Sequence, residues 1–444
     1  MSTWVRSAAA GVMALLACAI PDLALAQAGP APQAQGLFQA GGGAAGAGRQ
    51  SLTLSVSLVE AYDSNLRAGA TAVSPTLFQQ SGSYTSLTPT MSFASRGRSA
   101  QITATSGSTL RYYRELDRLV SIGHNVGAGV SAELTRRTRL SVNQGVAYAP
   151  SYLHGLFANA APATMGSAVN PATSYAVNGQ PSYQYSTSAG VSHAVTRRDT
   201  VSFNSAYRYT DFVGNTAGAS DLRSYDVGGR FTHLLSRDGS LRLGYTYRQA
   251  AYSSTQQRPS THDIDSGIAY QWPLSSARRT TLGFSAGSAV VTGPVSSAST
   301  QTRRQFRLVV DASLNHQMGR TWQLQGAYHR GVGFIEGIED PVFSDAVTVT
   351  TSGSLDRRTT VVMSTSYSTG NSALAIVSSN SFDTYTGDAE VRFAISRTWA
   401  TYVDYMYYFY NFNQSLQLSP GVSPNLRRHS VRAGLTLSVS LMGR

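Results

Sequence analysis

A short turn that carries arginine recurs about every forty residues along this chain, between stretches in which polar and apolar residues alternate. A fixed period of this length indicates a repeated supersecondary unit. Each unit contains one extended strand, a looser loop and a returning strand, which is the sequence pattern of a membrane-spanning β-barrel. The turns are Arg96-Gly97-Arg98, Thr135-Arg136-Arg137, Thr196-Arg197-Arg198, Ser236-Arg237-Asp238, Ala277-Arg278-Arg279, Gly319-Arg320-Thr321, Asp356-Arg357-Arg358 and Ser396-Arg397-Thr398.

Between the turns the hydrophobic period is two, as expected for a strand with one face on lipid and the other on water. Leu241, Leu243 and Tyr245, for example, alternate with Arg242 and Gly244. The turns join strands in pairs, and two further strands flank them at 52–62 and 428–441. The sequence therefore predicts an all-β fold, a transmembrane antiparallel up-and-down β-barrel of about 18 strands with an aqueous lumen.

Composition agrees with a membrane protein. Only 13% of the 444 residues are charged, which is low for a soluble globular protein. All basic residues are arginine, and the net charge of +12 would suggest nucleic acid in a soluble protein. Here the excess is spread over short turns, so we predict no nucleic-acid partner.

The N-terminal 26 residues are predicted to be a secretory signal peptide. Arg6 precedes a short apolar run at 8–20, and Ala24-Leu25-Ala26 has the small-residue pattern of a cleavage site. An alternative interpretation is lipoprotein acylation at Cys18, the only cysteine. Residues 27–50 are rich in Gly, Ala, Pro and Gln and are predicted to be a flexible periplasmic leader. The barrel is expected to occupy residues 51–444.

An even number of strands places both termini on the side of the short turns, which are therefore predicted to be periplasmic. Their arginines are expected to pair with inner-leaflet phosphates. Outward aromatic and histidine side chains are expected to form two interfacial girdles. The turn-side girdle would contain Trp322, Trp399, His193, His233, His316 and Phe393, and the loop-side girdle Tyr148, Tyr209, Tyr247, Tyr328, Tyr367 and Tyr407.

Two segments depart from the pattern. The interval between the turns at Arg136 and Arg197 is about twenty residues longer than the others, which predicts a long third extracellular loop at 153–181. This loop either folds inward as a constriction or stays outside the barrel. Glu60 is in phase with Leu54 and Leu58, so it is predicted to face outward unless a bulge near Val59 turns it inward.

Two patterns that resemble catalytic or metal sites are better explained by the barrel. Gly283-Phe284-Ser285-Ala286-Gly287 matches a nucleophile elbow, but that motif needs a sharp turn from a strand into a helix. Here it lies within a period-two strand, so Ser285 is interpreted as a small polar lumen residue. His193, His233 and His316 belong to separate strands, which is poor geometry for a metal site. We predict no catalytic residue, no metal and no cofactor.

The alternation places charged side chains of both signs inside the barrel. They are interpreted as a solvated wall in which opposite charges pair across strands, or as a transverse field that favours small polar or anionic solutes. The positive excess is +3, from eleven arginines and eight carboxylates. The predicted inward residues are Arg111, Arg139, Arg208, Arg230, Arg242, Arg248, Arg303, Arg307, Arg392, Arg428 and Arg432, with Glu133, Asp226, Asp263, Asp265, Asp311, Asp388, Glu390 and Asp404.

Three features together resemble a β-barrel porin family of Gram-negative outer membranes, some members of which lie near exopolysaccharide export genes. They are the signal and leader, the opening strand at 52–58 followed by Tyr62-Asp63-Ser64-Asn65, and the arginine-turn barrel that closes on 432–437. The last segment is similar to the C-terminal signal that the barrel-assembly machinery recognises. It departs from that signal by ending on Met442-Gly443-Arg444 without a terminal aromatic residue.

The sequence thus favours an outer-membrane barrel that acts as a passive diffusion pore or as an export channel for polysaccharide or small polar solutes. Outer-membrane lipids and the assembly machinery are its expected partners. A barrel sealed by its own loops, acting as an anchor, adhesin or assembly partner, is the alternative. A soluble β-propeller has a similar period, but each blade would need four short strands and more turns than these units contain.

Overall fold

In the computed structural model, the described residues are almost all strand residues. They are 50–65, 81–116, 118–149, 181–213, 221–253, 258–275, 278–294, 302–319, 321–335, 338–374, 382–412 and 425–443. The predicted signal peptide, nearly all of the leader and the 153–180 part of the long loop lie outside these ranges. No helix within the described ranges is long and apolar enough to cross a membrane.

Eighteen strands follow one another along the chain. They are β1 (Gln50–Asp63), β2 (Gly82–Arg96), β3 (Ala100–Tyr113), β4 (Leu119–Thr135), β5 (Thr138–Ala149), β6 (Ser182–Ala194), β7 (Asp199–Phe212), β8 (Leu222–Leu234), β9 (Gly239–Tyr252), β10 (Ser260–Ser275), β11 (Arg278–Pro294), β12 (Thr302–Met318), β13 (Trp322–Ile335), β14 (Ile338–Ser354), β15 (Thr359–Ser372), β16 (Phe382–Ala394), β17 (Trp399–Phe412) and β18 (Asn425–Gly443).

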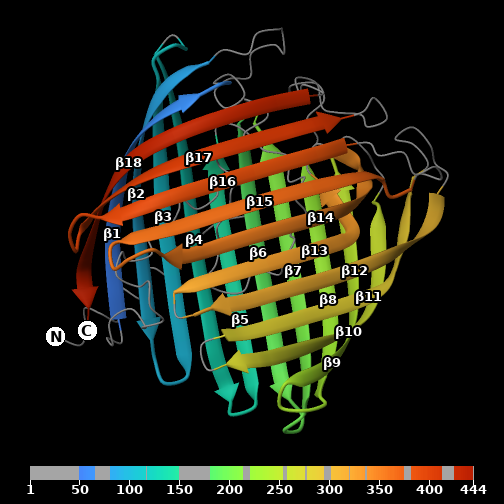
Figure 1. Ribbon diagram of the computed structural model, residues 1–444. Coiled ribbons are helices and arrows are strands. Elements are labelled where there is room, and N and C mark those ends of the chain that lie inside the picture. Colours follow the sequence, from blue (N-terminus) through green and yellow to red (C-terminus); the bar gives the residue numbers. More distant parts are fainter. Residues whose placement is uncertain are drawn as a thin grey trace, which may run out of the picture.

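The strands form one closed antiparallel barrel. Each strand pairs with the next along the chain, and β18 pairs with β1 from Ser51↔Gly443 to Asp63↔Ser430. Figure 1 shows β18 beside β1 and β2, with the front strands running obliquely over the back ones. Closure satisfies the backbone groups that an open sheet would leave at its edges. The predicted up-and-down barrel and its strand number are therefore confirmed.

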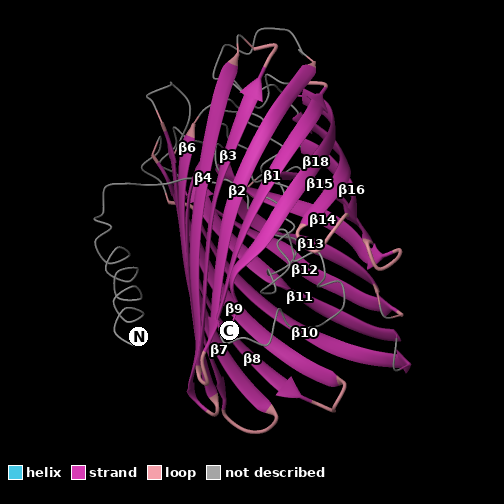
Figure 2. Cartoon of the chain, turned by 90° about the vertical axis from the view of Figure 1, so that its left-hand side faces the viewer, coloured by secondary structure: helices cyan, strands magenta, loops and turns pink. Residues whose placement is uncertain are grey.

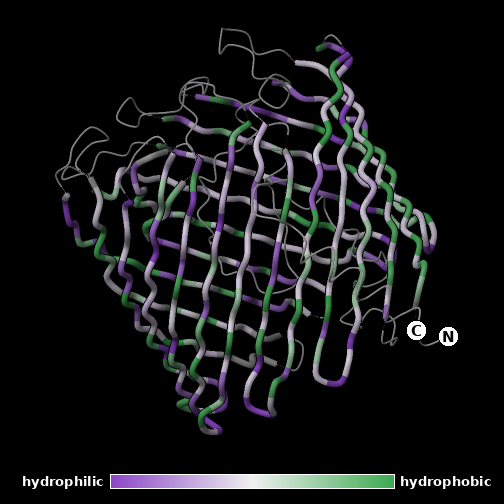
Figure 3. Tube along the Cα trace, turned by 180° about the vertical axis from the view of Figure 1, so that it is seen from behind, coloured by the Kyte–Doolittle hydropathy of each residue, from purple (hydrophilic) through white to green (hydrophobic). Residues whose placement is uncertain are grey.

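The two faces of the wall differ in polarity, and contacts that skip strands identify the inner one. Arg248 on β9 donates to the carbonyl of Val332 on β13, 2.8 Å away, and Ser57 on β1 lies 3.4 Å from the hydroxyl of Tyr402 on β17. Side chains converge on the concave side of a barrel and diverge on the convex side. The alternate positions carry exposed apolar side chains such as Leu54, Leu243 and Phe284. The tube in Figure 3 shows this alternation of hydrophobic and hydrophilic residues.

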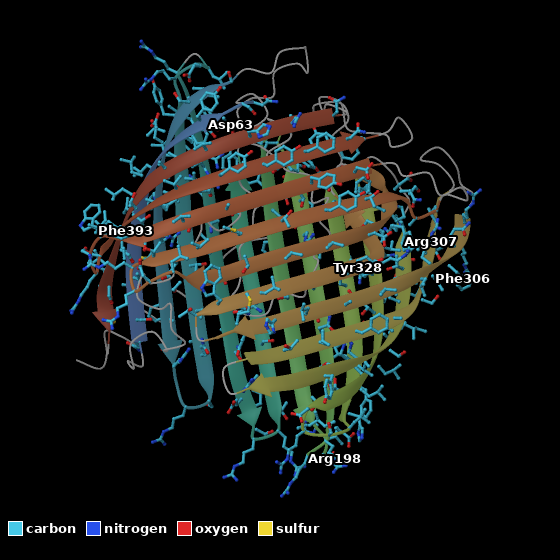
Figure 4. The ribbon with its side chains drawn as sticks, in the orientation of Figure 1. Asp63, Arg198, Phe306, Arg307, Tyr328 and Phe393 are labelled. Carbon is cyan, nitrogen blue, oxygen red and sulfur yellow. The ribbon has the colours of Figure 1, made fainter. Side chains whose placement is uncertain are left out.

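The arginine turns share one stabilising device. In each of five turns, the side-chain oxygen of the first residue accepts a hydrogen bond from the backbone amide two residues further on, as Thr196 does from Arg198 at 3.1 Å. This leaves the arginines exposed at the end of the barrel, and Figure 4 shows Arg198 extending beyond the strands. The other first residues of this kind are Thr135, Ser236, Asp356 and Ser396.

Aromatic side chains gather on the outer face near the loop ends. Tyr207 stacks on Tyr225 with ring centroids 4.8 Å apart. One arrangement occurs twice: the hydroxyl of Tyr245 lies 2.9 Å from Nδ1 of His262, and that of Tyr405 lies 2.8 Å from Nδ1 of His429. Rings with one polar end suit a boundary between lipid and water, which is consistent with the predicted girdle.

Glu60 lies on the outer face, since it is exposed and in phase with Leu54, Leu58 and Tyr62. Its carboxylate accepts a 2.7 Å hydrogen bond from the Thr85 hydroxyl. The register of β1 shifts only between Leu52 and Thr53, against β18, so the proposed bulge near Val59 is absent from this strand. The outward orientation predicted without a bulge is therefore the observed one.

Candidate functional site: the lumen and its constriction

The inner wall formed by β16, β17 and β18 holds a compact group of charges. The guanidinium of Arg432 pairs with Asp404 on the neighbouring strand and lies 3.8 Å from Asp388 one strand further. Arg392 forms a 2.9 Å salt bridge with Glu390. These side chains alternate with outward residues on three adjacent strands, so the period-two pattern brings them together.

A second group lies on β8 to β13, across the barrel. Arg248 forms a 3.3 Å salt bridge with Asp263, and the register of β8 and β9 places Asp226 directly opposite Arg248. His329 Nδ1 lies 2.6 Å from Asp311. Arg242 reaches over β10 and donates to the Ser285 hydroxyl on β11. The two groups give the lumen two charged walls, each containing both signs.

A third pair closes the barrel near the loop end. Arg428 on β18 donates to both carboxylate oxygens of Asp63 on β1, with Nε 3.0 Å from Oδ1 and Nη2 2.6 Å from Oδ2. Both side chains are almost fully buried, at 2% and 0% exposure. Arg111 lies nearby, over the ring of Tyr84. This pair fastens the first strand to the last.

The structure therefore distributes the predicted inward residues over several parts of the wall. Arg139 and Glu133 form a separate, exposed pair near the turn end. Asp63 and His329 were not predicted; adding Asp63 lowers the positive excess of the predicted set from +3 to +2. The sequence offered a signal for Asp63, because it is in phase with Val59 and Ala61, which face inward, but the strand was expected to end before it. The role of these residues in lining a pore remains a prediction.

A polar cavity of about 320 Å³ lies in the wall between β5 and β8. Its lining combines one arginine and one carboxylate, Arg208 and Asp226, with hydroxyl and amide side chains. Such a surface can exchange hydrogen bonds with a polyhydroxylated solute without burying a large apolar area. The inward hydroxyl and amide residues are Asn143, Ser186, Ser188 and Ser224.

The lumen is narrowed where β13 leaves the wall. Its pairing with β12 ends at Val310↔Arg330, whereas its pairing with β14 continues to Ile335↔Ile338. Gly331 and Gly333 flank Val332 at this point, and glycine allows close backbone approach. From Gly331 onward the β13–β14 hairpin is therefore free of β12 within the described ladders.

The tip of this hairpin contacts β8 and β9, which lie five and four strands away from β13 in the wall. The Val332 carbonyl accepts the hydrogen bond from Arg248 on β9, and Phe334 packs against Leu222, Ala250 and Tyr252 on β8 and β9. Because β10, β11 and β12 separate β9 from β13 in the wall, these contacts must cross the inside of the barrel. Figure 2 gives a side view of the strands that surround this region. The hairpin is a constriction that the sequence did not predict.

The segment after β15 packs against the same region. Ala373 and Leu374 are buried in an apolar cluster with Val291, Val309 and Phe343. Arg307 donates to the carbonyl of Ala373 at 2.9 Å, and Arg303 to that of Leu374 at 3.3 Å. Two of the predicted lumen arginines thus hold this segment in place through its backbone.

The catalytic and metal-like patterns are accounted for by the fold. Ser285 lies within β11 and is buried, with the hydrogen bond from Arg242 described above, so the surrounding motif is not at a strand-to-helix turn. No group of three metal-ligating side chains occurs among the residues described. His193, His233 and His316 instead lie beside neighbouring-strand oxygens of Thr138, Asp199 and Thr280.

No protein-family model and no curated protein matches this chain. Solved structures with a similar arrangement include Acinetobacter baumannii OccAB2, with 7% identity, a TM-score of 0.46, and coverage of 88% of this chain and 98% of that chain. Pseudomonas aeruginosa OccK2 (OpdF), crystallised with glucuronate, has 10% identity, a TM-score of 0.46 and coverage of 88% and 98%. Pseudomonas aeruginosa OprD has 10% identity, a TM-score of 0.41 and coverage of 89% and 96%. The fold assignment follows from the strand order and the closing β1–β18 pair.

Proposed function

We propose that this protein is an outer-membrane channel for passive movement of polar solutes. The observation that carries the proposal is the contrast between the two faces of the closed wall. Paired charges and hydroxyl groups line the inside, whereas exposed apolar side chains and an aromatic belt cover the outside. An apolar exterior suits lipid, and a polar interior suits water.

The constriction supports selection among solutes. The hairpin tip brings Phe334 and the Val332 carbonyl to the β8–β9 wall, close to the charges of Arg248 and Asp263. A solute that passes here exchanges its water for charged groups and backbone carbonyls, which favours polar molecules. The hydroxyl-rich cavity beside Arg208 fits a sugar, so the finer proposal is passage of saccharides, including polysaccharide chains.

Single-channel conductance of the purified full-length chain in planar bilayers tests the channel. We expect discrete current steps in the native protein and larger steps for Phe334→Ser, because the hairpin tip loses its apolar contact with β8 and β9. Phe393→Ser removes a similar ring from the outer face and is the matched control; its steps should equal those of the native protein.

Vesicle swelling with oligosaccharides of increasing length tests the finer proposal. Ser224→Leu should slow entry of the longer saccharides while leaving salt conductance unchanged, and Ser224→Thr, which keeps the hydroxyl, should behave as the native chain. Equal rates of entry of the longer saccharides through both variants would show that the cavity does not select solutes.

The second candidate function is an anchor or assembly partner with a sealed lumen. The crossing hairpin is the observation that favours it. No current from the native chain, and none from Phe334→Ser, would establish the anchor and exclude the channel. The proposed partners are the same for both functions. They are inner-leaflet phosphates at the turn arginines, outer-membrane lipids around the wall, and the barrel-assembly machinery at β18.

A further inference from the structure

The upper half of β12 is paired on one side only within the described ladders. Its register with β11 continues to Pro294↔Thr302, but its register with β13 stops at Val310↔Arg330. The edge at 302–309 therefore faces a break in the wall, created where the β13–β14 hairpin turns into the lumen. A break of this kind in a membrane barrel exposes backbone groups that need other partners.

The break lies near the level of the outer aromatic belt. Phe306 is opposite Val290 on β11, Val290 is opposite His262 on β10, and His262 is opposite Tyr247 on β9. Outside the break, Phe306 and Leu308 are 74% and 61% exposed. Figure 4 shows Phe306 on the outside of the wall and Arg307 toward the lumen. Lipid at this height would contact the break directly.

On the inner side, Ala373 and Leu374 cover the break. They pack on Val291, Val309 and Phe343, and their carbonyls accept hydrogen bonds from Arg307 and Arg303. The cover is held by this apolar surface, which includes Val332 of the hairpin, by the two guanidinium groups, and by a 2.6 Å hydrogen bond from the Ala373 amide to the carbonyl of Pro341 on β14. Both guanidinium groups donate here to neutral carbonyls. A carboxylate or sulfonate is a stronger acceptor for the same groups, because its hydrogen bonds are charge-assisted.

We propose that this break is a lateral portal through which a single-chain anionic amphiphile passes between the lumen and the outer leaflet. The headgroup replaces the carbonyls of Ala373 and Leu374 as the acceptor for Arg303 and Arg307, and the cover moves away. The alkyl chain then takes the apolar surface that the cover occupied, because burial of apolar surface is favourable. From there it reaches Phe306 and Leu308 and the surrounding lipid. No covalent bond changes in this passage.

The first test is photolabelling of the full chain in phosphatidylethanolamine–phosphatidylglycerol vesicles. The probe is a medium-chain alkyl sulfonate with a diazirine at the end of its chain. We expect labels on the inward residues Val291 and Val309 as well as on the outward residues Phe306 and Leu308. Asn204, which faces the lumen on β7, should stay unlabelled. Equal labelling of Asn204 would show entry through the aqueous lumen and would overturn the portal.

The second test closes the portal. Gly293→Cys with Leu374→Cys, joined by a short bismaleimide, fixes the cover to β11 and keeps both arginines, since a Cβ at Gly293 would lie 2.8 Å from the Leu374 side chain. Labelling of Val291 and Val309 should disappear, whereas labelling of Phe306 and the single-channel conductance should stay unchanged. The matched control is the cross-strand pair Thr348→Cys with Ser366→Cys, treated with the same reagent. Persistent labelling after closure would refute the portal, and so would loss of conductance, since the cover would then belong to the main channel.

The third test concerns the headgroup. Arg303→Gln with Arg307→Gln should lower labelling by the sulfonate about a hundredfold, roughly tenfold for each of the two charge-assisted hydrogen bonds lost, and leave labelling by the matching alkyl alcohol unchanged. Arg208→Gln removes a lumen arginine on another wall and should change neither. Equal losses for the sulfonate and the alcohol would contradict recognition of an anion. These labels are measured separately from conductance, so the portal and the channel can fail independently.

Discussion

Removal of the carboxylate at the β1–β18 closure should be among the most destabilising single changes in this chain. In Asp63→Ala, the Arg428 guanidinium keeps its buried position but loses the carboxylate that accepts its Nε and Nη2 hydrogen bonds. Breaking a buried ion pair by removing one partner costs about 3–5 kcal/mol. The two side chains are 0% and 2% exposed, so solvent offers little compensation.

The matched control is Glu133→Ala, which breaks the pair with Arg139. Those side chains are 54% and 61% exposed, and an exposed pair contributes about 0–1 kcal/mol. Guanidinium unfolding in lipid vesicles, followed by tryptophan fluorescence, gives both free energies of unfolding. The heat-modifiable band on gels should also convert at a lower temperature in Asp63→Ala.

The double variant Asp63→Ala with Arg428→Leu separates the pair from packing. It should be less destabilised than Asp63→Ala alone, because the uncompensated buried charge is gone. Equal free energies of unfolding for Asp63→Ala and Glu133→Ala would refute the reasoning, and so would a double variant that is no more stable than Asp63→Ala alone.

Three further predictions concern the wall and the turns. Leu243→Arg should impair assembly, since an arginine on the lipid face costs about 2–4 kcal/mol near the bilayer midplane, whereas Thr246→Arg should be tolerated in the lumen; the yield of the heat-modifiable form measures both. Gly287→Ala should lower the free energy of unfolding, because its added Cβ would clash with the backbone carbonyl of Ile264 on β10, whereas at Gly387 the nearest atom is 3.9 Å away and alanine should be accepted. Asp356 accepts the backbone amide two residues on, which holds the pKa of its carboxyl below 3.8. The stabilisation from this hydrogen bond is therefore complete above the ordinary carboxyl pKa and is lost as the pH falls through the lowered pKa. The unfolding midpoint of the native chain should exceed that of Asp356→Ser at neutral pH, and the difference should shrink below about pH 4.

The strand pattern was predictable because its cause is local. A wall between lipid and water imposes a period of two, and each tight turn needs a residue such as Thr196 or Asp356 whose side chain can accept the amides of the turn. Those constraints act within a few residues. They placed the turns, the outward position of Leu243 and the inward position of Arg432.

The constriction was not predictable because the period-two pattern continues through it. Tyr328, Arg330, Val332 and Phe334 alternate with His329, Gly331 and Gly333 as in any wall strand, yet the chain leaves β12 after Arg330. What distinguishes the hairpin is its contact with β8 and β9, whose residues lie far away in the sequence. The long loop at 153–181, which the spacing offered as the constriction, lies almost entirely outside the described residues, and its role stays a prediction.

The partners of the charged residues were also not predictable, although the side of the wall that each residue faces was. Alternation predicted which side chains face inward, but the partner of each depends on the register and on reach across strands. Arg242 bonds Ser285 two strands away, and Arg428 bonds Asp63 from the opposite end of the chain. Neither partner follows from the spacing of residues along one strand.

The most direct test of the channel is the current through single molecules that carry one cysteine, before and after a membrane-impermeant anionic thiol reagent is added. Phe203 and Asn204 are neighbours on β7 that face outward and inward, respectively. For Asn204→Cys the account predicts a stepwise fall in current as each molecule reacts, because the added group occupies the lumen. For Phe203→Cys it predicts no change, because that side chain faces lipid. A current that falls for Phe203→Cys but not for Asn204→Cys, or no current from either, would contradict a polar conduit inside this barrel.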